Sequence, residues 1–293
     1  MNRNGFKEPP AVCNRLMRKH ETVIRYLEGR YGERFASYDY EGARQVSAPN
    51  FLPGRIWLCW WQGLDQAPEL VRRCVRSIEK HAGGHEVIVI TDENVRDYIE
   101  FPEWLLEKHQ KGIISKTNLS DLLRLSLLAK YGGLWLDSTF LCTGDLEELA
   151  FGSPLFSIKR PGYGHCSVAC GYFAGYALAC DSDTRWIFAV IRDFFLKYWE
   201  TNDFLVDYLI VDYMIFLAQR HCSEIEEAFA AIRPNNSRCD DLFVRLGDIY
   251  DEDDWLELKA ETSLFKLSWK QRFPAERDGQ ATYYEKLVEG ELE

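Results

Sequence analysis

Residues 117–139 combine three short patterns that together restrict the fold strongly: an apolar helix, a glycine pair and a brief apolar strand. Leucines recur at helical spacing over residues 119–127, and Gly132 and Gly133 stand where a helix C-terminal cap belongs. The strand that follows ends directly on Asp137. An ionised carboxylate at the edge of a core costs free energy unless it is hydrated, paired or bound to a cation. The pattern therefore predicts a helix, a sharp turn and a core strand that presents Asp137 to a ligand.

Apolar runs of strand length and amphipathic helices alternate along much of the chain. The apolar runs predict strands at residues 56–61, 86–91, 134–137, 155–158 and 172–177. The helical spacing predicts helices at residues 11–30, 68–80, 117–130, 184–198 and 206–219. Such alternation is typical of an α/β protein with a parallel sheet covered by helices on its faces. Ligands of such folds collect beyond the carboxyl ends of the strands, and Asp137 lies at such an end.

The length of 293 residues favours one large domain. We predict an N-terminal helical extension over residues 1–50, a main domain over residues 51–275 and a tail over residues 276–293. The longest apolar stretch, residues 205–218, carries two Asp and is too short to span a bilayer, so we expect a buried helix there.

The composition argues against several classes of partner and site. A formal net charge of −11 argues against nucleic acid and against broad docking on an anionic membrane, so an anionic ligand would need a local group of cations. The nine Cys are an odd number without paired spacing, and we see no signal peptide ahead of them. These features predict reduced thiols in a cytoplasmic protein.

Two pairs of charged residues are candidates for the site. Asp121 and Arg124 are three residues apart on one helix, so they share a face and can form an ion pair or support a common ligand. Asp207 and Asp212 lie in the later apolar helix and are out of helical phase. We therefore expect only one of them to point inward, and we favour Asp212; a purely structural role is the alternative for both.

Two further segments offer groups that suit a nucleotide. Trp60 and Trp61 end the first predicted strand, and because successive strand residues face opposite ways we expect only one of them to line a pocket. Core packing is the alternative for either ring. The sequence KLSWK at residues 266–270 alternates Lys and Trp with apolar residues. That pattern is typical of a loop that closes over a ligand, or of a solvated edge strand.

The stretch SDLLRLSLLAKYGGLWLDST, residues 120–139, resembles the central motif of sugar transferases with the GT-A fold. The nearest resemblance is to the capsular polysaccharide synthesis group of retaining glycosyltransferases, which is similar to the initiating mannosyltransferases and, more distantly, to the glucosylating bacterial toxins. IWLCWWQG followed by PELVRRCVRSI resembles that group's opening strand and helix, and KLSWK resembles its closing segment. The likeness runs from about residue 53 to residue 271.

This resemblance implies a GT-A fold, a Rossmann-like mixed sheet flanked by helices. It implies transfer of a sugar from a nucleotide-diphosphate donor, with UDP favoured, to a growing surface or capsular glycan with retention of configuration. The implied partners are the nucleotide sugar and a saccharide or lipid-linked acceptor, with transient association at the inner face of a membrane.

The resemblance also implies roles for single residues. Asp121 and Arg124 would contact the donor sugar, with Arg124 also near the diphosphate. Asp137 would hold ribose or sugar hydroxyls beside a divalent cation, Mn²⁺ or Mg²⁺, in a DXD-type motif. Where the pattern often has a second Asp, this chain has Thr139, a weaker metal ligand. One of the two Trp would stack on the uracil, and the closing segment would cover the diphosphate with Lys266, Ser268, Trp269 and Lys270.

No residue of the sequence shows itself as the nucleophile of a double displacement. Retention then implies same-face attack, with position and electrostatics supplied by the protein and Asp212 as the acidic residue near the reaction centre. Two other functions compete with transfer. One is a nucleotide-sugar hydrolase or pyrophosphorylase, although no glycine-rich basic phosphate loop is present. The other is a catalytically silent glycan- or nucleotide-sugar-binding protein that lost strong metal binding at Thr139.

Overall fold

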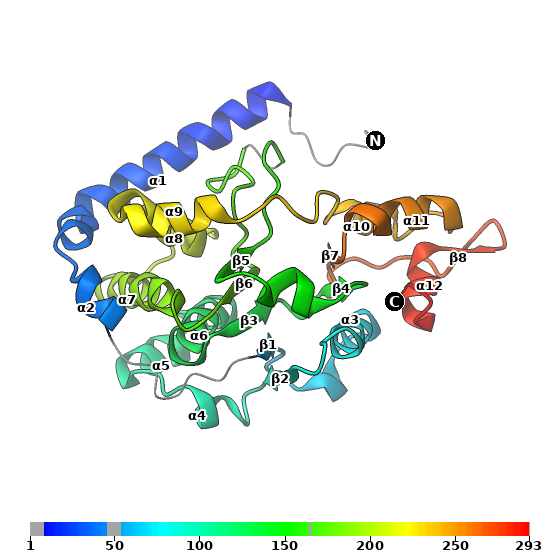
Figure 1. Ribbon diagram of the computed structural model, residues 1–293, viewed down its shortest axis with the longest axis horizontal. Coiled ribbons are helices and arrows are strands. Elements are labelled where there is room, and N and C mark those ends of the chain that lie inside the picture. Colours follow the sequence, from blue (N-terminus) through cyan, green and yellow to red (C-terminus); the bar gives the residue numbers. More distant parts are fainter. Residues whose placement is uncertain (1–8, 46–53, 164–165, 293) are drawn as a thin grey trace.

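The computed structural model describes residues 9–45, 54–163 and 166–292, and its centre is a five-stranded sheet with the order β2-β1-β3-β6-β5 (Figure 1). The strands are β1 (Arg55–Cys59), β2 (Glu86–Ile90), β3 (Gly133–Leu136), β5 (Leu155–Ser157) and β6 (Ala177–Cys180). β1 pairs in parallel with β2 and β3, whereas β6 runs antiparallel to β3 and to β5. The sheet is therefore mixed, as the GT-A resemblance implies, and the purely parallel sheet expected from the alternation is wrong for β5 and β6.

Both faces of this sheet are buried, and the strand residues divide between them alternately. In β1 and β3 the rings of Trp57 and Trp135 face one core cluster, while Ile56, Leu134 and their second neighbours face another. Side chains that alternate across a strand would leave one face polar if that face met water. The continuous apolar runs of the sequence are thus explained by helices on both sides.

The helices fall largely where the sequence predicts them, with shifted ends. They are α1 (Pro10–Ala36), α2 (Tyr40–Gln45), α3 (Glu69–Lys80), α4 (Val95–Tyr98), α5 (Glu103–Gln110), α6 (Lys116–Tyr131), α7 (Arg185–Thr201), α8 (Ile210–His221), α9 (Ser223–Ala231), α10 (Asp241–Arg245), α11 (Glu252–Glu261) and α12 (Tyr283–Glu289). The short turns η1 (Leu64–Gln66) and η2 (Glu147–Phe151) complete the helical elements of the described ranges. No helix in these ranges is both long enough and apolar enough to cross a membrane.

The strand predicted at residues 172–177 is wrong. The chain there makes turns, and β6 begins only at Ala177. Gly171 has a φ of 77° and packs so closely that a Cβ would collide with the carbonyl oxygens of Arg160 and Tyr163. Phe173 is buried in this loop. A buried loop can be as apolar in sequence as a buried strand, so the apolar run alone does not distinguish them.

The long helix α1 packs on α8 along one side of the molecule (Figure 1). Leu27 and Phe35 of α1 are completely buried. A disulfide joins Cys13 of α1 to Cys166, so the prediction that all nine Cys are reduced is wrong for this pair. The two Cys are 153 positions apart in the sequence, and no paired spacing indicates that they are bonded. The predicted division at residues 50 and 51 lies outside the described residues.

The C-terminal segments form a third cluster at the opposite end of the molecule, where α12 packs on α3 (Figure 1). β7 (Leu264–Lys266) pairs antiparallel with β4 (Phe140–Cys142), and β8 (Glu276–Arg277) pairs with β9 (Gln280–Ala281). The pairing of β7 with β4 connects a late segment of the chain to the strand that follows Asp137.

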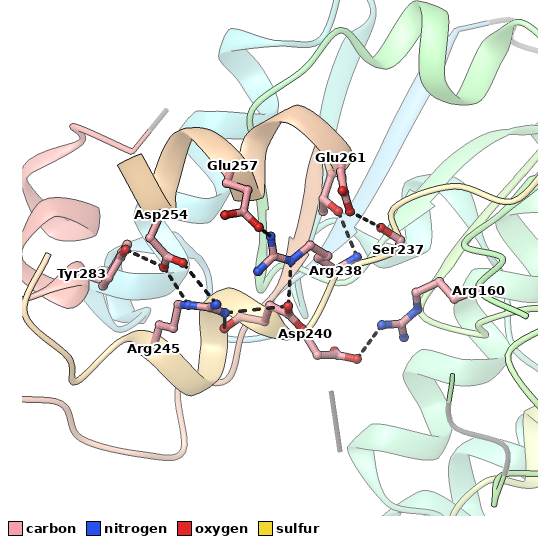
Figure 2. A network of polar contacts seen from close by, with 11 residues as sticks. Arg160, Ser237, Arg238, Asp240, Arg245, Asp254, Glu257, Glu261 and Tyr283 are labelled. Carbon is pink, nitrogen blue, oxygen red and sulfur yellow. Dashed lines mark hydrogen bonds and ion pairs between the residues drawn. The ribbon is translucent and has the colours of Figure 1, made fainter. Parts of the chain in front are cut away.

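A network of ion pairs holds α10, α11 and α12 together (Figure 2). Arg238 contacts Glu257, and Arg245 contacts Asp254 at 2.8 Å. The hydroxyl of Tyr283 donates to the same Asp254 at 2.9 Å. Arg238 and Arg245 are mostly buried, so these contacts fix the helices around β7, which pairs with β4.

Candidate active site

A pocket of about 620 Å³ opens beyond the carboxyl ends of β1 and β3. This is the position where open α/β sheets bind ligands, and the volume suits a small-molecule ligand. The lining residues are Cys59, Trp60, Trp61, Gln62, Gln66, Pro68, Lys116, Thr117, Ser120, Arg124, Trp135, Asp137, Ser138, Thr139, Tyr208, Lys266, Leu267, Ser268, Trp269 and Lys270. Four of them are Lys or Arg and one is Asp, although the whole chain carries a net charge of −11.

The glycine pair positions Asp137 as the sequence predicts. The side chain of Ser115 accepts from the Asn118 N–H and begins α6, and Gly132 ends it with a φ of 70°. Gly133, with a φ of 90°, packs so tightly that a Cβ would collide with the carbonyl oxygen of Arg55. Only glycine fits so close to the Arg55 backbone. The chain then continues directly into β3 and reaches the pocket at Asp137.

Arg124 is the central cation of the site. Its Nη2 lies 3.1 Å from Asp121 Oδ1 and 3.3 Å from Asp137 Oδ1, and its Nη1 donates to the carbonyl oxygen of Gly175. The guanidinium also lies over the ring of Trp135, 5.3 Å from its centroid. Only 10% of the Arg124 side chain is exposed. The structure thus brings Asp121, Arg124 and Asp137 together, as the spacing predicts.

Asp212 lies beside Gly175, whose carbonyl oxygen accepts from Arg124. The Gly175 N–H is hydrogen-bonded to Asp212, and a Cβ at Gly175 would lie 2.6 Å from Asp212 Oδ1. Asp207 precedes α8 and pairs instead with Lys19 of α1 at 2.7 Å. Of the two acids, Asp212 is therefore the one buried near Arg124. Neither Asp121 nor Asp212 is among the described residues that line the pocket.

Burial gives these two carboxyl groups unusual pKa values. Burial raises the pKa of Asp121 to about 6, although the Arg124 charge opposes the shift. Burial raises the pKa of Asp212 to about 7, again against Arg124. Both groups therefore carry a proton in the folded protein at a pH where an unfolded Asp has lost it.

Replacing Asp212 by Asn should flatten the pH dependence of stability. Between about pH 4 and pH 7 the folded protein binds more protons than the unfolded chain, so stability falls as pH rises through that window. Asn imitates the protonated carboxyl and cannot ionise. The stability of Asp212→Asn should therefore decrease less than that of wild type as the pH rises. Melting temperatures from pH 5 to pH 8 measure it, with Asp207→Asn as the matched control. Parallel curves for wild type and Asp212→Asn would contradict the expected protonation.

Both oxygens of Asp137 face protein cations. Besides Arg124 at Oδ1, Lys266 Nζ lies 3.5 Å from Oδ2, and the indole N–H of Trp135 donates to Oδ1 at 3.2 Å. Protein ion pairs therefore offset part of the Asp137 charge, and its contacts with a divalent cation and donor hydroxyls stay predictions. Lys266 comes from β7, and no sequence pattern indicates that this strand pairs with β4.

The prediction that only one of the two neighbouring Trp lines the pocket is also wrong. β1 ends at Cys59, so the alternation of strand side chains does not extend to Trp60 and Trp61, and both rings line the pocket. Trp60 stands edge-on to Trp269, with the ring centroids 5.7 Å apart. The Nε1 of Trp60 is buried without a hydrogen-bond partner in the described residues.

Several residues of the site were not predicted from the sequence, among them Lys116, Ser120, Tyr208 and Gly175. Trp61 is held by its N–H, which donates to Ser120 at 2.7 Å, and by Lys116, whose Nζ lies 4.7 Å from the ring centroid. Tyr208 stands at the rim and is 68% exposed. Gly175 contributes only backbone groups, so its residue type does not indicate a role in the site. Lys116 and Ser120 lie on the pocket end of α6, so the helical spacing from Arg124 was the available signal.

The oxygens near Asp137 do not form a ready site for the predicted Mn²⁺ or Mg²⁺. Mg²⁺ is usually held by one or two carboxylates together with substrate phosphates, so a single carboxylate suffices only if one of its oxygens is available to the ion. Asp137 is the one carboxylate among the described lining residues, and Thr139 Oγ1 accepts from Lys266 Nζ at 2.5 Å. Within the described ranges, no group of three or more His, Cys, Asp and Glu is placed to hold a metal ion. The ammonium of Lys266 faces both oxygens that the ion would need.

Comparison with solved structures finds similar chains among glycosyltransferases. The chain is similar to the galactosyltransferase LgtC in complex with donor and acceptor sugar analogs, at 15% identity and a TM-score of 0.41, over 80% of this chain and 94% of that one. An active-site mutant of LgtC gives 15% identity and a TM-score of 0.41, over 81% and 95%. The PaToxG glycosyltransferase gives 13% identity and a TM-score of 0.37, over 72% and 83%.

Comparison with protein families gives a match along nearly the entire sequence. A comparison with curated proteins finds no match. Residues 5–287, however, match the family model described as capsular polysaccharide synthesis protein. This span includes both halves of the site, from the first strand to the segment that carries Lys266. The resemblance of the central motif is confirmed, and the chain belongs to the capsular polysaccharide synthesis protein family.

Proposed function

We propose that the protein is a glycosyltransferase that moves a sugar from a nucleoside-diphosphate donor, UDP being favoured, to a glycan acceptor in capsular or surface polysaccharide synthesis. The observation that carries this proposal is the pocket's composition: Lys and Arg outnumber Asp there four to one, beside the rings of Trp60, Trp61 and Trp269. A nucleotide sugar offers an aromatic base and two phosphate charges. Stacking and charge-assisted hydrogen bonds recognise these two features.

The contacts support distinct roles for the residues of the pocket. Arg124 and Lys266 line it and bear positive charge, so they suit the diphosphate, and Lys270 extends this positive region. Asp137 holds both Arg124 and Lys266 in place and faces the pocket, where a sugar or ribose hydroxyl can donate to it. Asp121 lies behind Arg124 and acts as a positioning residue for that guanidinium.

The stereochemical proposal is retention by same-face attack. The acceptor oxygen forms a bond to the anomeric carbon while the bond from that carbon to the diphosphate oxygen breaks. The acceptor's hydroxyl proton passes to the departing phosphate. The described pocket lining contains no carboxylate free to act as a nucleophile, since both oxygens of Asp137 face cations. Asp212 contributes through the Gly175 peptide to the position of Arg124, rather than by contact with substrate.

The acceptor is proposed to be a saccharide, free or lipid-linked, that approaches past Tyr208. An exposed aromatic ring at a pocket rim suits a sugar face, and Tyr208 is such a ring. A cytoplasmic location with transient membrane contact remains a prediction of the sequence.

The decisive experiment incubates the purified protein with a panel of UDP-, GDP- and dTDP-sugars and measures release of the nucleoside diphosphate, with and without oligosaccharide acceptors. Transfer predicts release that increases with one acceptor and a new glycan product. Release without any acceptor dependence would indicate a hydrolase. Nucleotide-sugar binding without release would indicate a silent binding protein, the second candidate.

Replacing Trp60 and Trp61 by Ala should have different consequences. Trp60→Ala should weaken UDP binding about 10-fold, the order expected for loss of one base-stacking ring. Trp61 is 8% exposed, covered by Lys116 and bonded to Ser120, so Trp61→Ala should mainly lower the free energy of unfolding, by about 3 kcal/mol. Calorimetry and chemical denaturation measure the two effects. Equal and negligible losses of UDP affinity would exclude stacking on either ring.

A further inference from the structure

We propose that the ammonium group of Lys266 takes the place of a divalent cation at Asp137 and Thr139, so that the protein binds the diphosphate of its donor without a metal ion. This inference rests on the proposed function, because it concerns the same pocket. It contradicts the expectation of a Mn²⁺ or Mg²⁺ cofactor that the DXD-type motif implies.

The first observation is the set of atoms around Lys266 Nζ. It lies 2.5 Å from Thr139 Oγ1, 3.5 Å from Asp137 Oδ2 and 3.4 Å from the carbonyl oxygen of Leu267. An ammonium has three N–H donors and no acceptor, and here it meets three oxygen acceptors. Two of these oxygens belong to the first and third positions of the motif, which are the positions that would ligate a metal.

The second observation is that the backbone fixes Lys266. Its N–H donates to the carbonyl oxygen of Cys239 at 2.8 Å, and the next N–H, that of Leu267, donates to the carbonyl oxygen of Thr139 at 2.9 Å. In the pairing of β4 and β7, Phe140 stands opposite Lys266. The Nζ also lies 5.6 Å from the Phe140 ring centroid and 5.8 Å from that of Tyr176. Lys266 therefore belongs to a paired strand, and the part of KLSWK able to move as a lid begins after Leu267.

The third observation is the competition between the two cations. A divalent ion on Asp137 Oδ2 and Thr139 Oγ1 would lie beside the ammonium that already faces both oxygens, and like charges at such a separation repel strongly. The other oxygen of Asp137 faces Arg124. An Asp at position 139 would add charge for a metal, but Thr adds only a hydroxyl, which an ammonium can satisfy as donor.

These contacts leave Lys266 able to serve the donor. About a fifth of its side chain is exposed, and it lines the pocket. The two contacts of 3.4 and 3.5 Å are long for hydrogen bonds, so a phosphate oxygen can replace either of them while the bond to Thr139 persists. The ammonium then neutralises charge on the departing diphosphate together with Arg124 and Lys270.

Isothermal titration with UDP, and with GDP if UDP does not bind, tests the proposal in chelator-treated buffer and in buffer with Mn²⁺. Wild type should bind with the same affinity in both. Lys266→Met should bind about 10-fold more weakly or worse in chelator, the order expected for loss of a charge-assisted hydrogen bond. Lys197→Met is the matched control, because Lys197 forms only an exposed pair with Glu200 in the described residues and lies outside the pocket.

The double variant Lys266→Ala with Thr139→Asp provides a test by gain of property. Removing the ammonium and restoring the second carboxylate should make nucleotide binding depend on Mn²⁺, and direct titration with Mn²⁺ should reveal a site that wild type lacks. Wild-type binding that requires Mn²⁺ would overturn the proposal and leave the transferase function standing. Absence of nucleotide binding under either condition would overturn both.

Discussion

Asp137→Asn should reduce sugar transfer about 100-fold or more, the order of effect seen when a fixed electrostatic contact to the reacting groups is lost. The substitution keeps the shape of the side chain and removes the charge that holds two cations. Arg124 lies 3.3 Å from one oxygen and Lys266 lies 3.5 Å from the other, and both cations line the pocket. Without the carboxylate, these two groups repel each other and no longer present a fixed pair of charges to the diphosphate.

The same variant should be less stable, by about 2 kcal/mol, because it leaves the mostly buried Arg124 with one carboxylate fewer. Activity with a nucleotide-sugar donor and unfolding in urea measure the two effects. Asp203→Asn is the control: Asp203 pairs with Lys108 and is 70% exposed, so it should change neither quantity appreciably. A stable and fully active Asp137→Asn protein would end the assignment of this pocket as the site of transfer.

Arg124→Met should cost about 3 kcal/mol or more of folding free energy, because it removes the cation from among buried carboxyl groups. The guanidinium contacts Asp121 and Asp137 directly and opposes the upward pKa shifts of Asp121 and Asp212. Without it these pKa values should rise further. The loss of stability should therefore be larger at pH 8, where the carboxyl groups must ionise uncompensated, than at pH 5, where they retain protons.

Urea denaturation at the two pH values measures this difference. Arg124→Lys is the informative companion, because it keeps the charge and loses the planar fork that reaches Asp121, Asp137 and Gly175 together. It should recover part of the stability at pH 8 and little of the donor affinity. Equal losses for Arg124→Met at pH 5 and pH 8 would show that the guanidinium does not compensate these acids.

The parts of the site that depend on local sequence were predictable. The helix, the glycine pair and the strand that presents Asp137 are consecutive, so their geometry follows from helical spacing, positive φ angles and a short apolar run. Asp121 and Arg124 meet because they are three residues apart on one helix. In each case the interacting groups are close in the chain, so the helical period and the turn-forming residues are sufficient to predict their contact.

The parts that depend on distant contacts were not predictable. Lys266 reaches Thr139 across 127 residues through the pairing of β4 with β7, and three-residue strands have too few positions to show a period. Gly175 joins Asp212 to Arg124 through its peptide group, which no sequence pattern marks. The antiparallel β6 was misplaced because a buried loop precedes it. Direction and pairing of strands are decided by the packing of the entire sheet.

The pairing of β4 with β7 has a consequence for the order in which the protein is synthesised. A chain that emerges from the ribosome N-terminus first can form the parallel core of β1, β2 and β3, with Asp137 in place, long before residue 264 appears. Until then Asp137 has Arg124 but not Lys266, and the backbone of Thr139 has no partner from Leu267. The site is thus completed only when β7 is translated, more than a hundred residues after β3. A nascent or truncated chain can therefore acquire the shape of the sheet while it still lacks Lys266 and Lys270, two of the four cations that line the pocket.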